Sequence, residues 1–248
     1  MPGPVIITAT DANLFWLAKG LVASLADMRA ERGIAMACFD LGLTPSQRDW
    51  LAAADVRLLD PVDPLGIAGR EGFRPYMLGQ FCRPFLPGVL PGHDIYVWLD
   101  ADTWQQRPDG LGGLLHVAGF GLLACCPEMH VTYSNAGLVA PRQLRAWHRA
   151  WTGVFGREVA NSYAAVPMIN SGIFAAPGDH PLWSLWQQEL RVAIERPLTH
   201  LSEQMAFCRA VLGAPRVERL PAHWNWLCGF AMPRWTKRRD HRPSAGAS

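Results

Sequence analysis

The sequence of 248 residues lacks the features that mark several large classes of protein. It contains no uninterrupted apolar run of about 18 residues, so we expect no membrane span. Its N-terminus has neither a basic stretch nor a long apolar core, and we therefore expect no signal peptide. Charged residues make up 18% of the chain and apolar residues 50%, which is the opposite of the balance found in disordered proteins.

Cysteine and net charge are also low. Six cysteines are too few for a disulfide scaffold in a chain of this length, and none forms the C-x-x-C pair typical of a structural zinc site. We therefore expect reduced, mostly buried thiols in a cytoplasmic protein. The formal charge of +2 predicts no strong attraction for nucleic acid, so we expect no nucleic-acid partner. Peripheral contact with a membrane and the oligomeric state both stay open.

The first 60 residues alternate between short apolar runs and segments with helical spacing of apolar residues. Thr44-Pro45-Ser46-Gln47 forms a capping box with proline at the first helical position. This alternation predicts a parallel, doubly wound sheet, and hence an α/β fold. The predicted strands are 5–9, 34–39 and 56–59, and the predicted helices are 12–30 and 45–54.

The remainder of the chain continues the mixture of strands and helices after a loop at 60–74. We expect strands at 94–99, 122–126, 168–174 and 217–220, and helices at 76–85, 142–155, 181–195 and 202–212. No linker is evident, so we predict one domain over 1–235, with a mostly parallel central sheet flanked by helices. The basic and small residues of 236–248 are expected to form a frayed tail. Most of the 11 tryptophans, including Trp98, are expected to pack in the core.

Two acidic residues, Asp100 and Asp102, directly follow the apolar strand predicted at 94–99. Ligands bind at the carboxyl ends of strands in open α/β sheets. Two carboxylates so close together repel each other unless a cation or a basic group lies between them. Hard divalent cations suit such oxygen ligands and commonly bridge to phosphates. The pair therefore predicts Mn²⁺ or Mg²⁺ holding a diphosphate.

Two classes of enzyme place D-x-D after such a strand: nucleotide-sugar glycosyltransferases and haloacid-dehalogenase-like phosphatases. Asp100-Ala101-Asp102-Thr103 fits the D-x-D-x-T motif of the phosphatases literally. That class also needs a later acidic pair, however, and Gly178-Asp179 has no acidic residue four positions on. The phosphatase is therefore the less favoured interpretation.

The order of several further segments resembles that of the family 8 glycosyltransferases, which have the GT-A fold. The resemblance covers roughly residues 4–228 and includes an arginine 17 residues before the acidic pair. The segments that carry it are Thr8–Asn13, Arg83, Asp100–Asp102, Asn170-Ser171-Gly172, Ser202-Glu203-Gln204, Leu220-Pro221 and Trp224-Asn225-Trp226.

The resemblance implies roles for individual residues of the donor site. For the nucleotide, Asp11 would accept a hydrogen bond from uracil and Asn13 would support the nucleoside. Arg83 would bind the diphosphate or hold the acidic loop. Asp100 and Asp102 would hold the metal, with Asp100 also near the ribose. For the catalytic groups, Asn170 would face the donor sugar, Glu203 would bind a sugar hydroxyl and Gln204 would lie beneath the anomeric carbon.

Each of these residues also has a structural alternative. Asp11 could simply cap the following helix, and Asn170 could be an ordinary turn residue at a strand end. Ser202 could be a helix N-cap, with Glu203 and Gln204 merely in the first turn, where acidic residues favour the helix dipole. Arg83 could lie on the surface.

By resemblance, the implied activity is metal-dependent transfer of a hexose from a UDP-sugar to a glycan or lipid-linked acceptor, with retention of configuration. Gln204 is a poor nucleophile, so a same-face substitution guided by UDP agrees with the residue types present. The family's segment H-x-x-G-x-x-K-P-W, whose histidine completes the metal site, is absent here. A second hypothesis is therefore a catalytically weakened relative that binds nucleotide-sugar or serves as an interaction module.

Overall fold

The structure is a computed structural model that describes residues 3–107, 110–130, 133 and 141–232. Its strands are β1 (Val5–Thr10), β2 (Ala35–Asp40), β3 (Arg57–Leu59), β4 (Ile95–Leu99), β5 (Leu123–Pro127), β6 (Ile169–Pro177) and β7 (Val217–Arg219). Its α-helices are α1 (Phe15–Arg32), α2 (Pro45–Ala53), α3 (Met77–Phe81), α4 (Leu86–Val89), α5 (Gly110–Gly119), α6 (Pro141–Phe155), α7 (Arg157–Tyr163), α8 (Leu182–Ala193) and α9 (Ser202–Gly213), and its 3-10 helices are η1 (Arg83–Phe85) and η2 (Ala222–Asn225). In the part of the chain described, none of the helices is both long enough and apolar enough to cross a membrane.

All seven strands form one sheet in the order β3-β2-β1-β4-β6-β5-β7. β1 pairs in parallel with β2 and β4, β2 pairs in parallel with β3, and β5 does so with β7. β6 lies between β4 and β5 and runs antiparallel to both. The predicted α/β fold with a mostly parallel central sheet is therefore confirmed.

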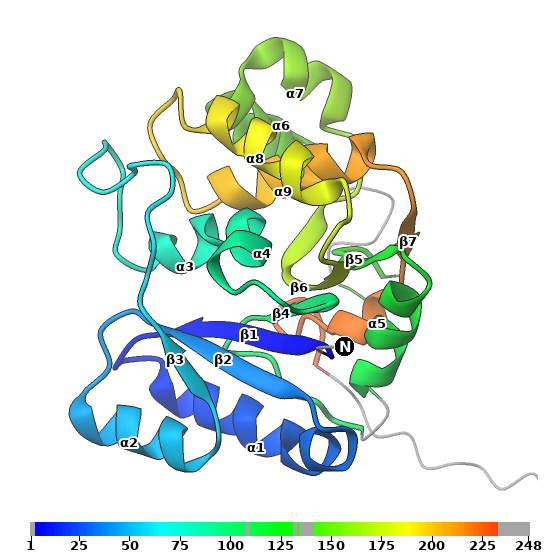
Figure 1. Cartoon of the computed structure of the whole chain (residues 1–248). Coiled ribbons are helices and arrows are strands. Elements are labelled where there is room, and N and C mark those ends of the chain that lie inside the picture. Colours follow the sequence, from blue (N-terminus) through cyan, green and yellow to red (C-terminus); the bar gives the residue numbers. More distant parts are fainter. Residues whose placement is uncertain (1–2, 108–109, 131–132, 134–140, 233–248) are drawn as a thin grey trace, which may run out of the picture.

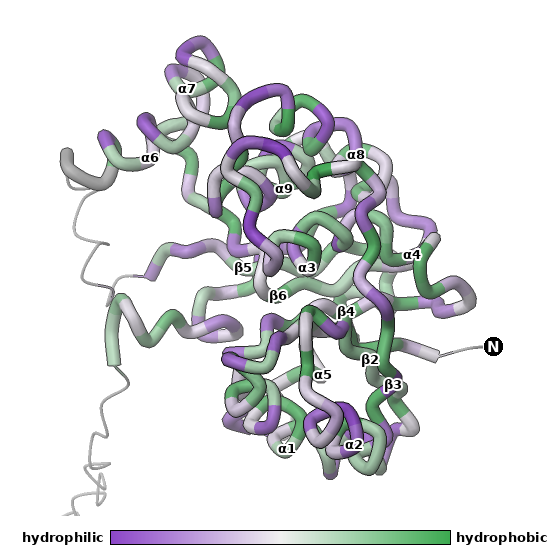
Figure 2. The backbone as a smooth tube through the Cα atoms, turned by 90° about the vertical axis from the view of Figure 1, so that its left-hand side faces the viewer, coloured by the Kyte–Doolittle hydropathy of each residue, from purple (hydrophilic) through white to green (hydrophobic). Residues whose placement is uncertain are grey.

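Helices cover both faces of this sheet (Figure 1). One buried cluster packs α1, α2 and α5 against one face, and a larger cluster packs α3, α4 and α6 to α9 against the other. Figure 2 shows the same division from the side, with the hydrophobic stretches of the sheet between the two groups of helices. Trp147 and Trp151 of α6 and Trp183 and Trp186 of α8 are buried, in line with the core role expected for most tryptophans. Five of the six cysteines are buried, and all six thiols are free.

The local sequence accounts for most element boundaries. Thr44 accepts the backbone N–H of Gln47, and Gln47 in turn accepts the backbone N–H of Thr44, so the predicted capping box is confirmed. The segment predicted as a helix over 76–85 is helical, but it is divided into α3 and η1. A continuous α-helix does not form there, because Pro84 cannot donate the backbone N–H that it needs.

Two helices, α5 and α7, lie in segments for which the sequence patterns predicted no element. α5 carries four glycines in ten residues, which gives it poor intrinsic helix propensity; tertiary packing against β5 and β6 stabilises it instead. The predicted boundary between domain and tail at 235/236 lies outside the described residues, as does the basic Lys237–Arg239.

The antiparallel β6 is the element that assembles the candidate site. Leu99 at the end of β4 pairs with Ile173, so the start of β6 extends past the carboxyl end of β4. The backbone N–H of Asp100 donates to the carbonyl of Gly172 over 2.8 Å. Residues that are 70 positions apart in the sequence therefore meet at the edge of the sheet where β1 and β4 also end.

Candidate functional site

Asp100 holds a defined orientation at the end of β4. Its Oδ1 accepts hydrogen bonds from Nη2 of Arg83 over 2.5 Å and from Nε1 of Trp98 over 2.7 Å. Its side chain is 38% exposed, so the carboxylate lies between the protein interior and solvent. Trp98 is buried in the core as predicted, and it also touches the predicted metal ligand.

Arg83 is a buried cation that two carboxylates share. It is 4% exposed, so the alternative that it lies on the surface is wrong. Besides Asp100, it donates through Nη1 to Oε2 of Glu203 over 3.1 Å, and to the carbonyl and hydroxyl of Ser171. We call Arg83, Asp100, Ser171 and Glu203 the arginine cluster. One guanidinium thus joins η1, β4, β6 and α9.

Glu203 lies in the first turn of α9, as its structural alternative predicted, but its side chain is buried and only 1% exposed. Its Oε2 also accepts from the hydroxyl of Ser171, while its buried Oε1 has no partner among the described residues. Burial raises the pKa of Glu203 to about 7, against the opposing effects of Arg83 and Ser171. Ser202 is the first residue of α9 and not its N-cap, and its hydroxyl accepts the N–H of Thr199.

A second group of side chains surrounds Glu128, the residue directly after β5. Oε1 of Glu128 accepts from Nδ2 of Asn170 over 2.7 Å and from Nε2 of Gln204 over 3.0 Å. Oδ1 of Asn170 accepts from Nδ2 of Asn225 over 2.9 Å. We call Glu128, Asn170, Gln204 and Asn225 the amide cluster. Asn170 is therefore part of a side-chain network within β6, where its Oδ1 also accepts the N–H of Gly172, so the alternative of an ordinary turn residue is wrong.

Sequence reasoning missed Glu128. The signal that singled out Asp100, an acidic residue directly after an apolar strand, was also present here, because Glu128 follows the strand predicted at 122–126. The backbone N–H of Glu128 donates to the carbonyl of Met168, which fixes the residue beside the start of β6. Asn225 belonged to a quoted motif, but its contact with Asn170 spans 55 residues and has no local signature.

Gly172 lies between the two clusters, and its lack of a side chain leaves room for both. A Cβ on this residue would lie 2.4 Å from Oδ2 of Asp100 and 2.8 Å from Oδ1 of Asn170, and real Cβ atoms do not approach so closely. The glycine of the predicted N-S-G motif is thus required by steric contact at this position, where the two clusters come together.

Asp11 and Asn13 follow β1, at the same edge of the sheet. Oδ1 of Asp11 accepts the backbone N–H groups of Asn13 and Leu14, each over 2.9 Å. Asp11 therefore orders the turn that leads into α1, but it is not the helix cap of its structural alternative, because the N-cap residue of α1 is Leu14. No contact joins Asp11 or Asn13 to the arginine cluster or the amide cluster, so their predicted role in nucleoside binding stays a prediction.

Asp102 lies in the turn after β4, and its side chain is exposed. The surrounding protein atoms still raise its pKa by desolvation, and repulsion from Asp100 adds to this effect. Oδ2 of Asp100 makes no hydrogen bond with a described residue, so both aspartates retain hard oxygen donors. No set of three His, Cys, Asp or Glu side chains suited to a metal occurs in the described ranges. Two carboxylates nevertheless fit Mn²⁺ or Mg²⁺ when a diphosphate supplies further oxygens.

No protein-family model matches the sequence, and no curated protein matches it. Solved structures do match. The galactosyltransferase LgtC, in complex with donor and acceptor sugar analogues, is 15% identical, with a TM-score of 0.55 over 88% of this chain and 73% of LgtC. An active-site mutant of LgtC is 16% identical, with a TM-score of 0.56 over the same fractions of the two chains. The bifunctional glycosyltransferase WbbM is 16% identical, with a TM-score of 0.59 over 89% of this chain and 39% of WbbM. The likeness shows that the chain has the GT-A fold.

Proposed function

We propose that this GT-A chain is a metal-dependent glycosyltransferase that transfers a hexose from a UDP-sugar to a glycan or lipid-linked acceptor, with retention of configuration. The observation that carries the proposal is the meeting of the two clusters at Gly172, directly beside the acidic pair. The likeness to a galactosyltransferase and to a bifunctional glycosyltransferase supports the same class of reaction.

Asp100 and Asp102 would hold the divalent ion through their carboxylates. When bound, the ion supplies positive charge that neutralises the diphosphate as it leaves, so no general acid is required. The turn formed by Asp11 and Asn13, at the end of the neighbouring strand β1, would bind the nucleoside. The carboxyl end of β1 would thus bind the nucleoside of UDP, and the carboxyl end of the parallel strand β4 would bind its diphosphate through the ion.

Glu203 and Arg83 would recognise the donor sugar. Oε1 of Glu203 is buried and has no partner in the described part of the chain, so a sugar hydroxyl could donate to it once the side chains that cover it have moved. An unsatisfied carboxylate oxygen is costly in a protein interior, and a ligand that donates to it gains affinity. Arg83 keeps this carboxylate in place through the 3.1 Å hydrogen bond.

Gln204 and Glu128 would face the reacting carbon. The amide of Gln204 is a poor nucleophile, which favours a same-face substitution guided by UDP. Glu128 adds a negative charge whose position Asn170 and Gln204 fix, and such a charge stabilises the positive charge that develops at an anomeric carbon.

The experiment that tests this proposal is calorimetric titration of UDP into the protein with and without Mn²⁺. We expect binding that requires Mn²⁺ and is lost in Asp102→Asn. The matched control is Asp179→Asn, which neutralises another exposed aspartate beyond the opposite end of β6. Folded protein that binds UDP under no condition would contradict the proposal. If binding is seen, hydrolysis of UDP-glucose and UDP-galactose is measured next.

A second candidate function is nucleotide-sugar binding without transfer. The absence of a third carboxylate, histidine or cysteine ligand beside Asp100 and Asp102, within the residues described, favours it. Mn²⁺-dependent UDP binding without hydrolysis or transfer of any tested UDP-sugar would select this candidate. The phosphatase interpretation has less support, because that class needs a later acidic pair and Gly178-Asp179 has no acidic residue four positions on.

A further inference from the structure

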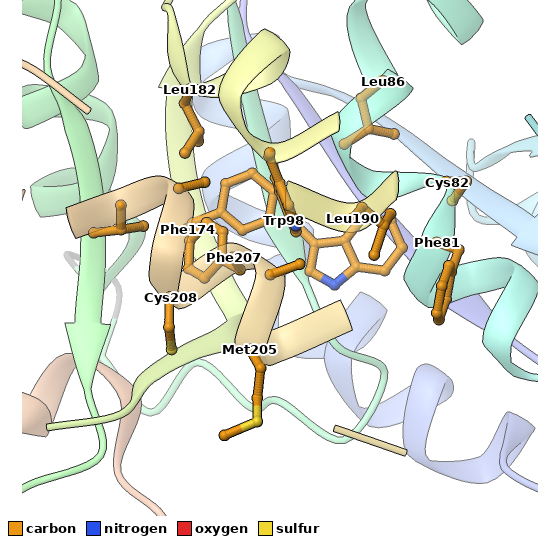
Figure 3. Packing of buried hydrophobic residues seen from close by; sticks show 14 of the residues in the cluster. Phe81, Cys82, Leu86, Trp98, Phe174, Leu182, Leu190, Met205, Phe207 and Cys208 are labelled. Carbon is orange, nitrogen blue, oxygen red and sulfur yellow. The ribbon is translucent and has the colours of Figure 1, made fainter. Parts of the chain in front are cut away.

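Trp98 is a buried tryptophan whose indole N–H donates to a side-chain carboxylate, whereas that of buried Trp183 donates to the backbone carbonyl of Pro177. Figure 3 shows Trp98 in the buried cluster that also holds Phe174 and Phe207. Trp151 and Trp186 are as deeply buried, but the indole N–H of each lacks an acceptor in the ranges that the structure describes. The N–H of Trp98 instead donates to Oδ1 of Asp100 over 2.7 Å. Packing alone therefore does not describe Trp98.

The position of Trp98 in β4 explains this contact. Residues two apart in a strand point to the same face, so the side chain of Asp100 continues the row that Trp98 occupies. A donor to an ionised carboxylate forms a hydrogen bond about twice as strong as one between neutral groups. The indole N–H of Trp98 thus fixes the position of Oδ1 of Asp100, a predicted metal ligand.

The same indole also supports the buried cation. The guanidinium carbon of Arg83 lies 4.6 Å from the centroid of the Trp98 ring, within the range of a cation–π interaction. Arg83 and Trp98 donate to the same oxygen of Asp100, so the three side chains form a closed triangle of contacts. Because Oδ1 accepts both donors, Oδ2 is the oxygen left for a ligand.

We propose that Trp98 is a positioning residue of the candidate metal site, which orients Asp100 through its N–H and Arg83 through its ring face so that Oδ2 of Asp100 faces the ion. The metal part of this inference rests on the proposed function. Groups that orient metal ligands typically account for about ten- to hundred-fold in metal affinity. The effect of removing the N–H should therefore be separable from loss of packing.

The test compares Trp98→Phe with Trp151→Phe, each of which replaces a buried indole by a smaller ring. Binding of Mn²⁺ is measured by calorimetry in saturating UDP, and urea unfolding is followed in parallel. We expect Trp98→Phe to lose more stability than Trp151→Phe, because only the former removes a hydrogen bond, and we expect the dissociation constant for Mn²⁺ to rise about ten-fold or more only in Trp98→Phe. An unchanged Mn²⁺ affinity in Trp98→Phe, or an equal loss in both variants, would overturn the proposal.

A second measurement does not depend on metal. In protein labelled with ¹⁵N at the indole nitrogen, the Trp98 signal is the one that disappears in Trp98→Phe. We expect Asp100→Asn to shift this signal and to speed its exchange with solvent, and to leave the Trp151 signal in place. If native protein binds no UDP with Mn²⁺, the proposed function fails, and the indole signal alone decides the role of Trp98. A Trp98 signal that Asp100→Asn does not shift would refute the positioning role of Trp98.

Discussion

The arginine cluster and the amide cluster each orient a glutamate, but they do so with different chemistry. Glu203 is 1% exposed and is paired with a buried guanidinium and a hydroxyl. Glu128 is half-buried and is held by two neutral amides. A buried charge needs a charged partner, whereas a carboxylate near solvent needs only to be oriented. The first cluster should therefore dominate stability, and the second should matter mainly for chemistry.

Removal of Arg83 should have the largest effect on stability. Arg83→Met leaves Glu203 buried without its cation, and breaking a buried pair in this way costs about 3–5 kcal/mol of unfolding free energy. Urea unfolding measures the change. The control, Arg48→Met, removes an exposed cation that pairs with Asp40 and should cost far less. Equal losses in the two variants would show that the burial of Arg83 does not set its contribution to stability.

The pKa of Glu203 should make stability depend on pH. Because the folded-state pKa of about 7 lies above the ordinary value of 4.5, the folded protein binds more protons than the unfolded chain between these values. The stability contributed by Glu203 is therefore fully present below about pH 4.5 and falls as pH rises towards 7, by about 3 kcal/mol. Glu203→Gln should flatten this part of the profile. A profile that keeps its slope in the variant assigns the effect to another group.

Gly172→Ala should disturb both clusters at once. The new Cβ meets Asp100 and Asn170, and overpacking of this kind costs about 1–3 kcal/mol. Mn²⁺-dependent UDP binding should also weaken, because Asp100 must move. The control is Gly20→Ala, since nothing lies within 4 Å of a Cβ there and alanine favours the interior of α1. Unchanged UDP binding in Gly172→Ala would show that the two clusters do not constrain each other.

Glu128→Gln should have the smallest effect on stability. The amide oxygen of the new side chain can still accept from Asn170 and Gln204, so we expect a change within about 0.5 kcal/mol. Turnover of a UDP-sugar should nevertheless fall by about 10²-fold or more, because the fixed negative charge is lost. Kinetics and urea unfolding of the same preparation separate the two effects. A stable variant with native turnover would remove Glu128 from the chemistry.

Much of the arginine cluster could be predicted from the sequence, because its residues carry local signals. Asp100 and Asp102 follow an apolar strand, and Arg83 stands at a recognisable spacing before them. The amide cluster was predicted only in part. Asn170 and Gln204 belonged to quoted motifs, but Glu128 was missed, because an acid after a strand gains meaning only when its spatial neighbours are known.

The sequence by itself determined the elements, because apolar runs, helical spacing and capping residues act over a few positions. It thereby determined the α/β class and the acidic pair at a strand end. Only the tertiary structure decided that β6 lies antiparallel between β4 and β5, since strand pairing joins segments far apart in the chain. That placement brings Gly172 against Asp100, Asn170 against Glu128 and Ser171 against Arg83. The site thus results from long-range packing, which local patterns do not encode.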